Sequence, residues 1–405
     1  MPIHIHGVSS RIPVHLLRPR IGRVIGHSKT VLPQIFTITL GHGLASKPVP
    51  STRTSVFAAT MDTVKNTIGE NFGGPAQNLA THQFDLDDVP DLAGKVAVVT
   101  GGSEGIGYGI TYTLLRHNIA KIYILSTSEQ VVEGAKKAIA TELSQAAADK
   151  TEWLQCDLAD WKKTQKVAKQ IRKDAGRLDI LINNAARGVM TYQLTDYGVD
   201  RHMAVNHMGH VVLTSQILPL MKETAAKGNT VRIVNQASNV HQLVPKDAKF
   251  ESLEELNRDL GPNTQYGRSK LANILYARDF TKHVTNAGHP NILMNSTHPG
   301  FVSTKMSKQD ILEPFPLGGY GMAVGMEPFK KDQLDGAKSA IYAATVTDKS
   351  GQYICAPAVP ESGSILAQDD ALADSLMTLT RQVIMEKMMG RSADTECHFE
   401  ELVLY

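Results

Sequence analysis

A glycine-rich turn between a short apolar strand and a helix constrains the fold of this chain more than any other feature. The segment 96–100 is apolar and β-branched, and it leads directly into Thr100-Gly101-x-x-x-Gly105-Ile106-Gly107. Glycines in this context permit a tight turn and close approach of a phosphate to backbone amides, while the helix N-terminus supplies partial positive charge. The turn therefore predicts a dinucleotide-binding βα unit, and the alternative is a glycine turn without a ligand.

Strand and helix patterns alternate from this turn to about residue 360. The expected strands are 96–100, 121–126, 153–157, 178–183, 230–237, 291–297 and 351–355. The expected helices begin near 106 and span about 129–147, 199–222, the region around 266 and 336–345. Strands separated by helices imply parallel βαβ units. The predicted fold class is therefore α/β, with a doubly wound parallel sheet of Rossmann type and an N-terminal extension.

A tyrosine and a lysine lie four residues apart in Tyr266-Gly-Arg-Ser-Lys270. On a helix this spacing places both side chains on one face. A phenol has an ordinary pKa of about 10, and a nearby ammonium favours the phenolate and lowers that pKa. The pair therefore suits proton transfer to or from an alcohol or carbonyl oxygen. Alone it could be a solvated helix face, but the upstream glycine turn and an intervening Ser238 favour a catalytic interpretation.

Composition excludes several other classes. The 405 residues are 42% hydrophobic and 20% charged, which fits a globular protein with a sizeable core. Cys156, Cys355 and Cys397 lack paired spacing, so they predict neither a disulfide framework nor a metal site and favour a reducing compartment. No apolar run approaches the ~20 residues that a membrane span requires.

The first sixty residues contain seven Lys or Arg and no Asp or Glu. The rest of the chain has 35 basic and 40 acidic residues, a net charge of −5, so nucleic acid is not an expected partner. A basic, acid-free leader is typical of a mitochondrial transit segment. Pro13, Pro19 and Pro33 would interrupt a long amphipathic helix there. The alternative is an untargeted leader, or a true start at Met61, and a cytoplasmic protein.

These patterns divide the chain into four parts. Residues 1–60 form the leader, and 61–94 are expected to hold a short helix followed by an acidic linker. Residues 95–360 form the nucleotide-binding domain, with a substrate lid at about 301–333. Residues 361–405 form a tail with a surface helix near 371–389.

Several motifs resemble the short-chain dehydrogenase/reductase family, in the order in which that family has them. They are the glycine turn, Asp157-Leu158, Asn183-Asn184-Ala185-Ala186, Val205-Asn206-His207-Met208-Gly209, Asn235-Gln236-Ala237-Ser238, Tyr266-x-x-x-Lys270, and Pro299-Gly300 with Thr304. The resemblance covers about residues 90–360, and Ala186 departs from the glycine of the family motif. The segments around Asn206 and Tyr266 are similar to the retinol-dehydrogenase-like branch. With its basic leader, the chain resembles the mitochondrial short-chain oxidoreductases of filamentous fungi.

The resemblance implies a catalytic set of Ser238, Tyr266, Lys270 and Asn206. Ser238 would hold the substrate oxygen, Tyr266 would exchange its proton, and Lys270 would lower the tyrosine pKa and bind the nicotinamide ribose. Asn206 would hold a water that links Lys270 to solvent. Taken singly, Ser238 could end a strand and Asn206 could brace a helix. The implied cofactor contacts are Thr100, Gly101, Ser103, Gly105, Ile106, Gly107, Ser126, Thr127, Asp157, Leu158, Asn184, Ala185, Tyr266, Lys270, Pro299, Gly300 and Thr304.

The expected cofactor is NADP, with NAD as the alternative. The second strand ends in Ser126, Thr127 and Ser128, without the acid that would bind the ribose 2′-hydroxyl of NAD and repel a 2′-phosphate. Glu104 within the turn argues mildly against a 2′-phosphate. No metal is expected, because the histidines 202, 207, 210 and 241 lack zinc-like spacing and are interpreted as surface or core residues.

The apolar lid suggests a lipophilic alcohol or carbonyl substrate, although such a loop could also pack on the domain. A homodimer through the helices of Asn206 and Tyr266 is a further expectation of the resemblance. The main alternative function is a non-catalytic, nucleotide-sensing or scaffold protein on the same fold, which would need none of Ser238, Tyr266 and Lys270. A third hypothesis is a lipid-associated protein that uses the basic leader as a surface anchor.

Overall fold

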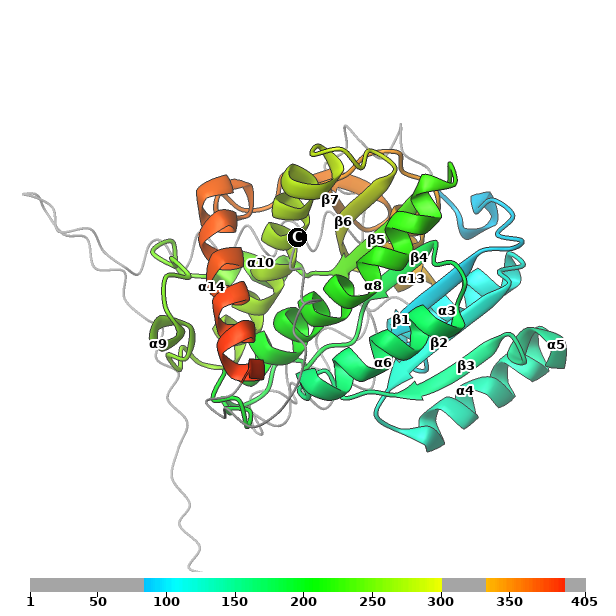
Figure 1. The fold of residues 1–405 in the computed structure, drawn as a ribbon, viewed down its shortest axis with the longest axis horizontal. Coiled ribbons are helices and arrows are strands. Elements are labelled where there is room, and N and C mark those ends of the chain that lie inside the picture. The colour runs from blue at the N-terminus through cyan, green and yellow to red at the C-terminus, as the bar shows by residue number, and fades with distance from the viewer. Residues whose placement is uncertain (1–83, 301–332, 390–405) are drawn as a thin grey trace, which may run out of the picture. The chain divides into compact units, whose positions relative to one another are not determined.

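One sheet organises the part of the chain that the computed structural model describes, residues 84–300 and 333–389. Its strand order is β3-β2-β1-β4-β5-β6-β7-β8, and all neighbours are parallel except β7 and β8. The predicted doubly wound parallel sheet is confirmed (Figure 1). The strands are β1 (Val96–Thr100), β2 (Lys121–Ser126), β3 (Thr151–Gln155), β4 (Ile180–Asn183), β5 (Val231–Gln236), β6 (Ile292–His298), β7 (Tyr353–Cys355) and β8 (Val359–Glu361).

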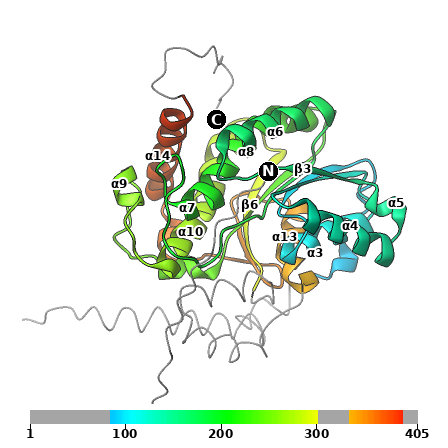
Figure 2. The same cartoon turned by 90° about the horizontal axis from the view of Figure 1, so that it is seen from below.

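Helices cover both faces of this sheet (Figure 2). The α-helices are α3 (Gly105–Arg116), α4 (Glu129–Glu142), α5 (Gln145–Ala148), α6 (Trp161–Asp174), α7 (Arg201–Met203), α8 (Gly209–Ala226), α9 (Leu253–Leu256), α10 (Pro262–Phe280), α13 (Gln333–Thr345) and α14 (Asp370–Met389). The short 3-10 helices are η1 (Leu86–Asp88), η3 (Asn239–Leu243) and η6 (Leu366–Gln368), and η2 (Ala204–Met208) and η4 (Thr281–Thr285) are π-helical. Among the described helices, none is both long and apolar enough to cross a bilayer.

Two buried clusters explain why the strands read as continuous apolar runs. In β1, Val98 belongs to a cluster that also holds residues of α6, α8, α10 and α14, whereas Ala97 and Val99 belong to a second cluster with residues of α3, α4 and α13. The same alternation places Tyr123 in the first cluster and Ile122 in the second. Because successive side chains of a strand point to opposite faces, a sheet covered on both faces needs apolar residues throughout.

Four local expectations differ from the structure. The long helix expected at 129–147 is two helices, because Ser144 caps α5 by accepting a hydrogen bond from the amide of Ala147. The acidic segment expected as a linker forms η1 and buries Leu86 in the core. The helix expected at 199–222 contains the π-helical turn η2, and the edge strand β8 was not predicted.

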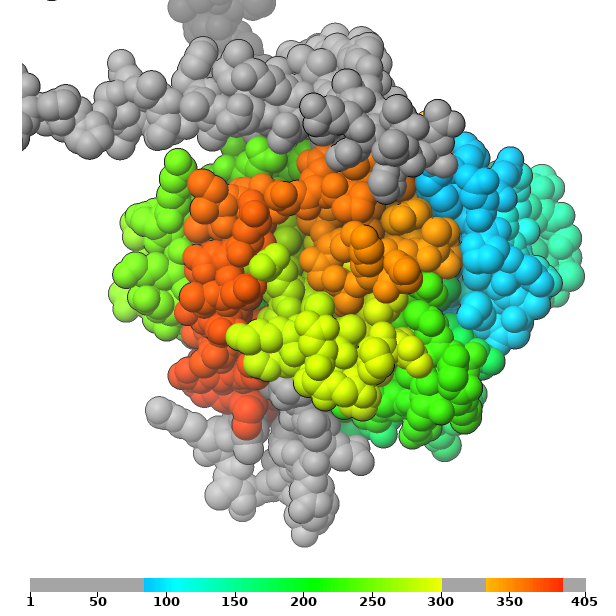
Figure 3. Space-filling model, turned by 90° about the horizontal axis from the view of Figure 1, so that it is seen from above, coloured from blue at the N-terminus to red at the C-terminus, as the bar shows by residue number. Residues whose placement is uncertain are grey.

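The tail helix lies where it was expected but differs in its packing. A surface helix was expected near 371–389, whereas α14 packs on α10 and contributes buried residues such as Leu376 and Met377 to the core. Its outer charges also form ion pairs, since Asp370 binds Arg278 at the end of α10 and Asp374 binds Lys282 in η4. Figure 3 shows the red surface of α14 adjoining the yellow surface of the chain around η4.

The carboxyl ends of β1, β4, β5 and β6 meet at one edge of the sheet, because these strands are parallel neighbours. This edge brings together Thr100, Asn183, Gln236 and His298, which are far apart in the sequence. All four side chains are buried. Ligands of open α/β sheets bind outside this carboxyl edge, so the functional site is expected here.

Candidate active site

The glycine turn adopts the shape that its sequence predicts. Gly101 and Gly105 have φ angles of 63° and 55°, in the left-handed region that favours glycine. A Cβ at Gly107 would overlap the carbonyl oxygen of Gly101, so α3 can begin directly under the turn only with glycine there. Glu104 provides no side-chain cap for α3. The helix N-terminus therefore keeps amide donors for a phosphate, and the loop fits a dinucleotide.

Ser103 is buried within this turn and Ile106 is half-buried beside it. Of the three hydroxyls after β2, Ser128 caps α4 by accepting from the amide of Val131. This leaves Ser126 and Thr127, of which Thr127 is exposed. The Ser126 hydroxyl is buried and has no hydrogen-bond partner among the described residues. An orphaned hydroxyl beside the glycine turn fits a polar group of a cofactor ribose.

Asp157 and Leu158 lie after β3 with different surroundings. Asp157 is exposed, and its carboxylate accepts a hydrogen bond of 2.9 Å from the amide of Ala159. Leu158 is buried, and its carbonyl and Cβ press on Gly209 so closely that a side chain there would overlap them. The Asp157 carboxylate thus stabilises its own turn and remains accessible.

Asn184 and Ala185 are attached to the end of β1. The Thr100 hydroxyl oxygen accepts hydrogen bonds of 2.9 Å from the amides of both residues. The Asn184 side chain donates to the Thr100 carbonyl at 2.9 Å. These contacts tie the carboxyl end of β4 to the glycine turn and give Asn184 a structural role there.

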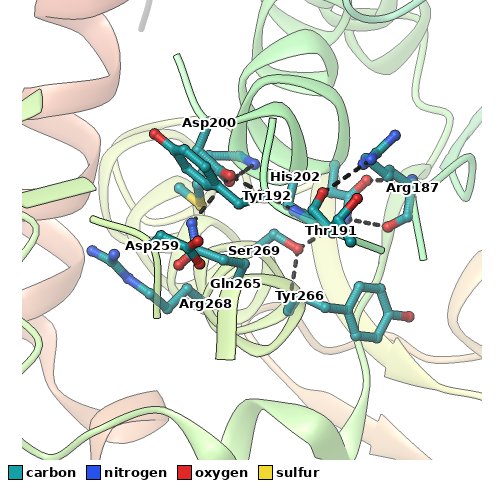
Figure 4. Close-up of polar contacts among 12 residues, drawn as sticks. Arg187, Thr191, Tyr192, Asp200, His202, Asp259, Gln265, Tyr266, Arg268 and Ser269 are labelled. Carbon is teal, nitrogen blue, oxygen red and sulfur yellow. Dashed lines mark hydrogen bonds and ion pairs between the residues drawn. The ribbon is translucent and has the colours of Figure 1, made fainter. Parts of the chain in front are cut away.

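Tyr266 and Lys270 lie on α10, with the Lys270 ammonium 5.3 Å from the centre of the Tyr266 ring. Lys270 is buried and donates a hydrogen bond of 2.9 Å to the main-chain carbonyl of Gln236. Burial lowers the pKa of Lys270 to about 7, because it penalises the charged form. Figure 4 shows the Tyr266 ring pointing away from the polar network in which Ser269 donates to the Tyr266 carbonyl.

Ser238 follows β5 two residues after Gln236 and caps η3. Its hydroxyl accepts from the amide of Val240 at 3.3 Å, and a proton on that oxygen remains to be donated elsewhere. The Ser238 carbonyl accepts a hydrogen bond of 2.8 Å from the His241 ring. The other ring nitrogen of His241 accepts from the amide of Ser364 at 3.0 Å. His241 thus attaches the Ser238 loop to the segment that precedes α14.

Asn206 lies in the π-helical turn η2 and is buried. Its side chain accepts from the Arg187 amide at 2.7 Å and donates at 2.9 Å to both the Arg187 carbonyl and the Ser269 hydroxyl. The side-chain amide is therefore occupied by protein groups. A water of the kind expected at Asn206 would have to bind the main chain instead.

Pro299 is buried and Gly300, with a φ of 76°, is half-buried immediately after β6. Both follow His298, whose ring accepts a hydrogen bond of 3.3 Å from the Asn239 amide. Thr304 and the expected lid, apart from Gln333, lie outside the described residues, as do the leader and the helix expected at 61–72.

Sequence comparison provides the deciding observation. The family model described as short chain dehydrogenase matches residues 95–245. The chain is 55% identical over 366 residues to "Putative oxidoreductase bli-4, mitochondrial" of Neurospora crassa, covering 89% of each protein. The chain belongs to the short-chain dehydrogenase family. The predicted membership is thus confirmed, and the protein is an oxidoreductase of this family, whose fold binds NAD or NADP.

Other short-chain dehydrogenases extend the comparison. Mouse retinol dehydrogenase 12 is 32% identical over 267 residues, covering 65% of this chain and 78% of the relative. This likeness agrees with the predicted resemblance to the retinol-dehydrogenase-like branch. A crystal structure of an uncharacterized protein from Mycobacterium paratuberculosis has a TM-score of 0.56 and 25% identity, covering 75% of this chain and 97% of the other.

The four histidines singled out in the sequence, 202, 207, 210 and 241, are all buried, and none lies on the helix surface. His202 contacts the Gly188 carbonyl at 2.9 Å, and His207 contacts the Thr380 hydroxyl of α14 at 3.0 Å. Burial lowers the pKa of His207 to about 3 and that of His241 to about 4. Sequence reasoning missed that these rings organise the site. The available signal was two polar rings three residues apart, His207 and His210, within a largely apolar segment.

One group in the described part of the chain, Asp279, His283 and Asp374, brings three potential metal ligands within 4.8 Å of one another. Both carboxylates already bind cations, because Arg381 lies 3.1 Å from Asp279 and Lys282 lies 2.9 Å from Asp374. We assign no metal to this group.

Proposed function

We propose that this protein transfers hydride between a nicotinamide cofactor and a lipophilic alcohol or carbonyl compound, with Tyr266 as acid and base. The observation that supports this most strongly is the arrangement on α10. Lys270 is buried 5.3 Å from the Tyr266 ring centre and is anchored to Gln236 at the carboxyl end of β5. The glycine turn lies at the same edge of the sheet.

Each residue of the proposed set has a distinct task. The Ser238 hydroxyl donates a hydrogen bond to the substrate oxygen and holds it beside the Tyr266 phenol. Tyr266 gives that oxygen a proton in reduction and takes one in oxidation. The Lys270 charge stabilises the phenolate during this exchange. The Asn206 side chain links the main chain of Arg187 to α10, because it accepts from the Arg187 amide and donates to the Ser269 hydroxyl.

The cofactor, when bound, supplies the hydride donor or acceptor. The residues that would hold it are the glycine turn for the pyrophosphate, Ser126 and Thr127 for the adenosine ribose, and Asp157 and Leu158 for adenine. The remaining contacts are proposed for Asn184, Ala185, Pro299, Gly300 and Thr304. We favour NADP, because the end of β2, Ser126-Thr127-Ser128, carries no acid that would repel a 2′-phosphate.

The lipophilic substrate follows from the apolar residues between 301 and 332 and from the relatives. One relative is named a retinol dehydrogenase, and the zebrafish relative named polyprenol dehydrogenase is 29% identical over 279 residues. A mitochondrial location is supported by the basic leader and by the name of the Neurospora relative.

The test combines binding with turnover. Titration of NADPH and NADH into the purified chain, followed by energy transfer from tryptophan to the reduced nicotinamide, identifies the cofactor. A panel of long-chain aldehydes and ketones is then assayed by loss of reduced nicotinamide absorbance. Tyr266→Phe should bind the cofactor normally and lose turnover by about 100-fold or more.

Equal turnover in Tyr266→Phe would refute the mechanism. Cofactor binding without turnover by the unaltered chain on any alcohol or carbonyl would favour the nucleotide-sensing scaffold. Binding of neither cofactor by a folded sample would refute both.

A further inference from the structure

A buried histidine that the proposed mechanism does not use lies between the glycine turn and the catalytic helices. His210 stands four residues after Asn206, at the start of α8, and is buried. One ring nitrogen, Nε2, lies 2.9 Å from the Thr100 hydroxyl at the end of β1. The other, Nδ1, lies 3.1 Å from the Asn206 carbonyl oxygen in η2. The ring therefore spans from the end of β1 to the π-helical turn.

The partners determine which nitrogen of His210 bears the proton. A main-chain carbonyl only accepts, so Nδ1 must donate to Asn206. Burial, together with the charge of Lys270, lowers the pKa of His210 to about 4, so the ring is neutral near pH 7. In a neutral ring with a proton on Nδ1, Nε2 is an acceptor. Nε2 therefore accepts the hydroxyl proton of Thr100.

The Thr100 hydroxyl agrees with this direction. Its oxygen already accepts from the amides of Asn184 and Ala185, both at 2.9 Å. Its single proton has two acceptors within reach, the Ile182 carbonyl at 3.3 Å and His210 at 2.9 Å. The shorter contact is the one to His210. The hydroxyl thus accepts hydrogen bonds from two backbone amides and donates one to the ring.

These bonds close a loop around the segment 184–187. Thr100 holds the segment at Asn184 and Ala185, and the Asn206 side chain holds it at the main chain of Arg187. The His210 ring links the Thr100 hydroxyl to the Asn206 main-chain carbonyl. Asn206 continues through Ser269 to the Tyr266 carbonyl on α10. A continuous buried path therefore connects the glycine turn to the helix of the proposed acid and base.

We propose that His210 is a positioning residue that sets the distance between the cofactor turn and the catalytic helix, a role that presupposes the oxidoreductase function proposed above. The ring is buried between Thr100 and Asn206 and acts through these two residues. The π-helical turn is part of the device, because irregular helix turns place carbonyl groups outside the regular ladder and recur at functional sites. An apolar ring of similar size would remove both hydrogen bonds of His210 and leave the Thr100 proton only the longer contact to the Ile182 carbonyl.

Substitutions can separate positioning from packing. His210→Phe keeps a flat ring and removes both hydrogen bonds. His210→Asn keeps a donor near the position of Nδ1, within reach of the Asn206 carbonyl. Thr100→Val removes the hydroxyl from the other end, and Thr100→Ser retains it as the matched control. Tyr266 and Lys270 are left unaltered in all four variants.

The first readout needs no substrate. Nitrogen-15 spectra of the histidine rings, with His210 assigned by its disappearance in His210→Phe, should show a proton on Nδ1 and none on Nε2 from about pH 8 to about pH 6. A proton on Nε2, or titration of the ring in that range, would overturn the inference. This measurement stands even if the chain turns over no carbonyl compound, so failure of the proposed function is detected separately.

The second readout is kinetic, at a temperature at which each variant is folded by circular dichroism. His210→Phe and Thr100→Val should lower kcat by about tenfold to 100-fold, while KM for the carbonyl substrate changes little, since small misplacements cost that much. Thr100→Ser should restore most of kcat, and His210→Asn should retain part of it. Variants with lower melting temperature but unaltered kcat would show a packing role only and would overturn the inference.

Discussion

The ammonium of Lys270 donates a 2.9 Å hydrogen bond to the main-chain carbonyl of Gln236, two residues before Ser238. The Asn273 side chain donates to the same carbonyl at 3.0 Å. One carbonyl oxygen at the end of β5 thus holds two residues of α10 and positions this helix relative to the Ser238 loop. The relative placement of Ser238, Tyr266 and Lys270 depends on this contact as much as on helix spacing.

Lys270 should impose a pH dependence on stability. Its pKa falls from 10.5 to about 7 on folding because the charge is desolvated. Between these values the unfolded chain binds more protons than the native state, so the free energy of unfolding rises with pH. From about pH 7 to about pH 9 we expect the unaltered chain to gain about 1–3 kcal/mol relative to Lys270→Met. Urea unfolding at both pH values measures this, and parallel pH dependences would contradict it.

The glycine turn offers a matched pair of substitutions. Gly107→Ala places a Cβ against the Gly101 carbonyl, so the turn must open and cofactor affinity should fall by about 100-fold. Gly134→Ala is the control, because its Cβ would meet nothing within 4 Å in the exposed middle of α4. It should raise the free energy of unfolding by about 0.5–1 kcal/mol. Fluorescence titration with NADPH and urea unfolding give the two readouts, and unchanged affinity in Gly107→Ala would remove the turn from the proposed site.

His241 should stabilise the Ser238 loop only while it is neutral. Its pKa falls from 6.5 to about 4 on folding, so its contribution is present above pH 6.5 and is lost as the pH falls toward 4. His241→Phe retains a ring against Tyr353 and loses the bonds to Ser238 and Ser364. We expect a loss of about 1–3 kcal/mol near pH 7 that shrinks near pH 5. Urea unfolding tests it, and a constant loss across this range would show that the ring acts by packing alone.

Helix α14 should be an integral part of the core. Leu376 is fully buried, and Leu376→Ala should lower the free energy of unfolding by about 2–4 kcal/mol. Met385 on the same helix is 46% exposed, and Met385→Ala should change that energy by less than about 0.5 kcal/mol. Urea unfolding compares the two, and equal effects would mean that α14 does not pack as described.

Helix α14 also bears on the expected homodimer, because it covers part of the proposed dimer face. Because α14 packs on α10 and its Thr380 contacts His207 in η2, part of the face expected to form the dimer is already covered. We therefore expect light scattering of the chain to give a monomer, or a dimer that uses a different face. A dimer that dissociates on substitution of exposed α10 residues would contradict this expectation.

The periodic elements were predictable because their signals are local. The strand before Gly101 and the helix spacing of Tyr266 and Lys270 depend on residues within one turn or one strand. The contacts that align the site are not local. His210 meets Thr100 across 110 positions, and His207 meets Thr380 across 173. Pattern analysis had classed these rings as surface or core residues, since nothing adjacent in the sequence reveals a partner so distant.

The tail helix was placed correctly near 371–389, but its packing partner was not predicted. The Leu and Met positions of α14 indicate an apolar stripe, but the stripe does not state which surface it covers. Its acids Asp370 and Asp374 give the segment a polar appearance, and they pair with Arg278 at the end of α10 and with Lys282 in η4. Likewise, Ser144 interrupts the Ala-rich segment because its side chain caps a second helix. Composition does not reveal whether a serine caps a new helix or continues the old one.

The packing of α14 also fixes an order for biosynthesis. The cluster beneath α3, α4 and α13 draws on residues up to Ile354, whereas the cluster beneath α8 and α10 needs residues as late as Met388. When the nascent chain has emerged only as far as β7, the cluster beneath α3, α4 and α13 has all its residues. The cluster beneath α8 and α10 still lacks α14, so its apolar residues are exposed. Such a nascent chain is a natural client for chaperones, because exposed apolar surface aggregates. The side of the sheet that supports Tyr266 is completed only when α14 emerges.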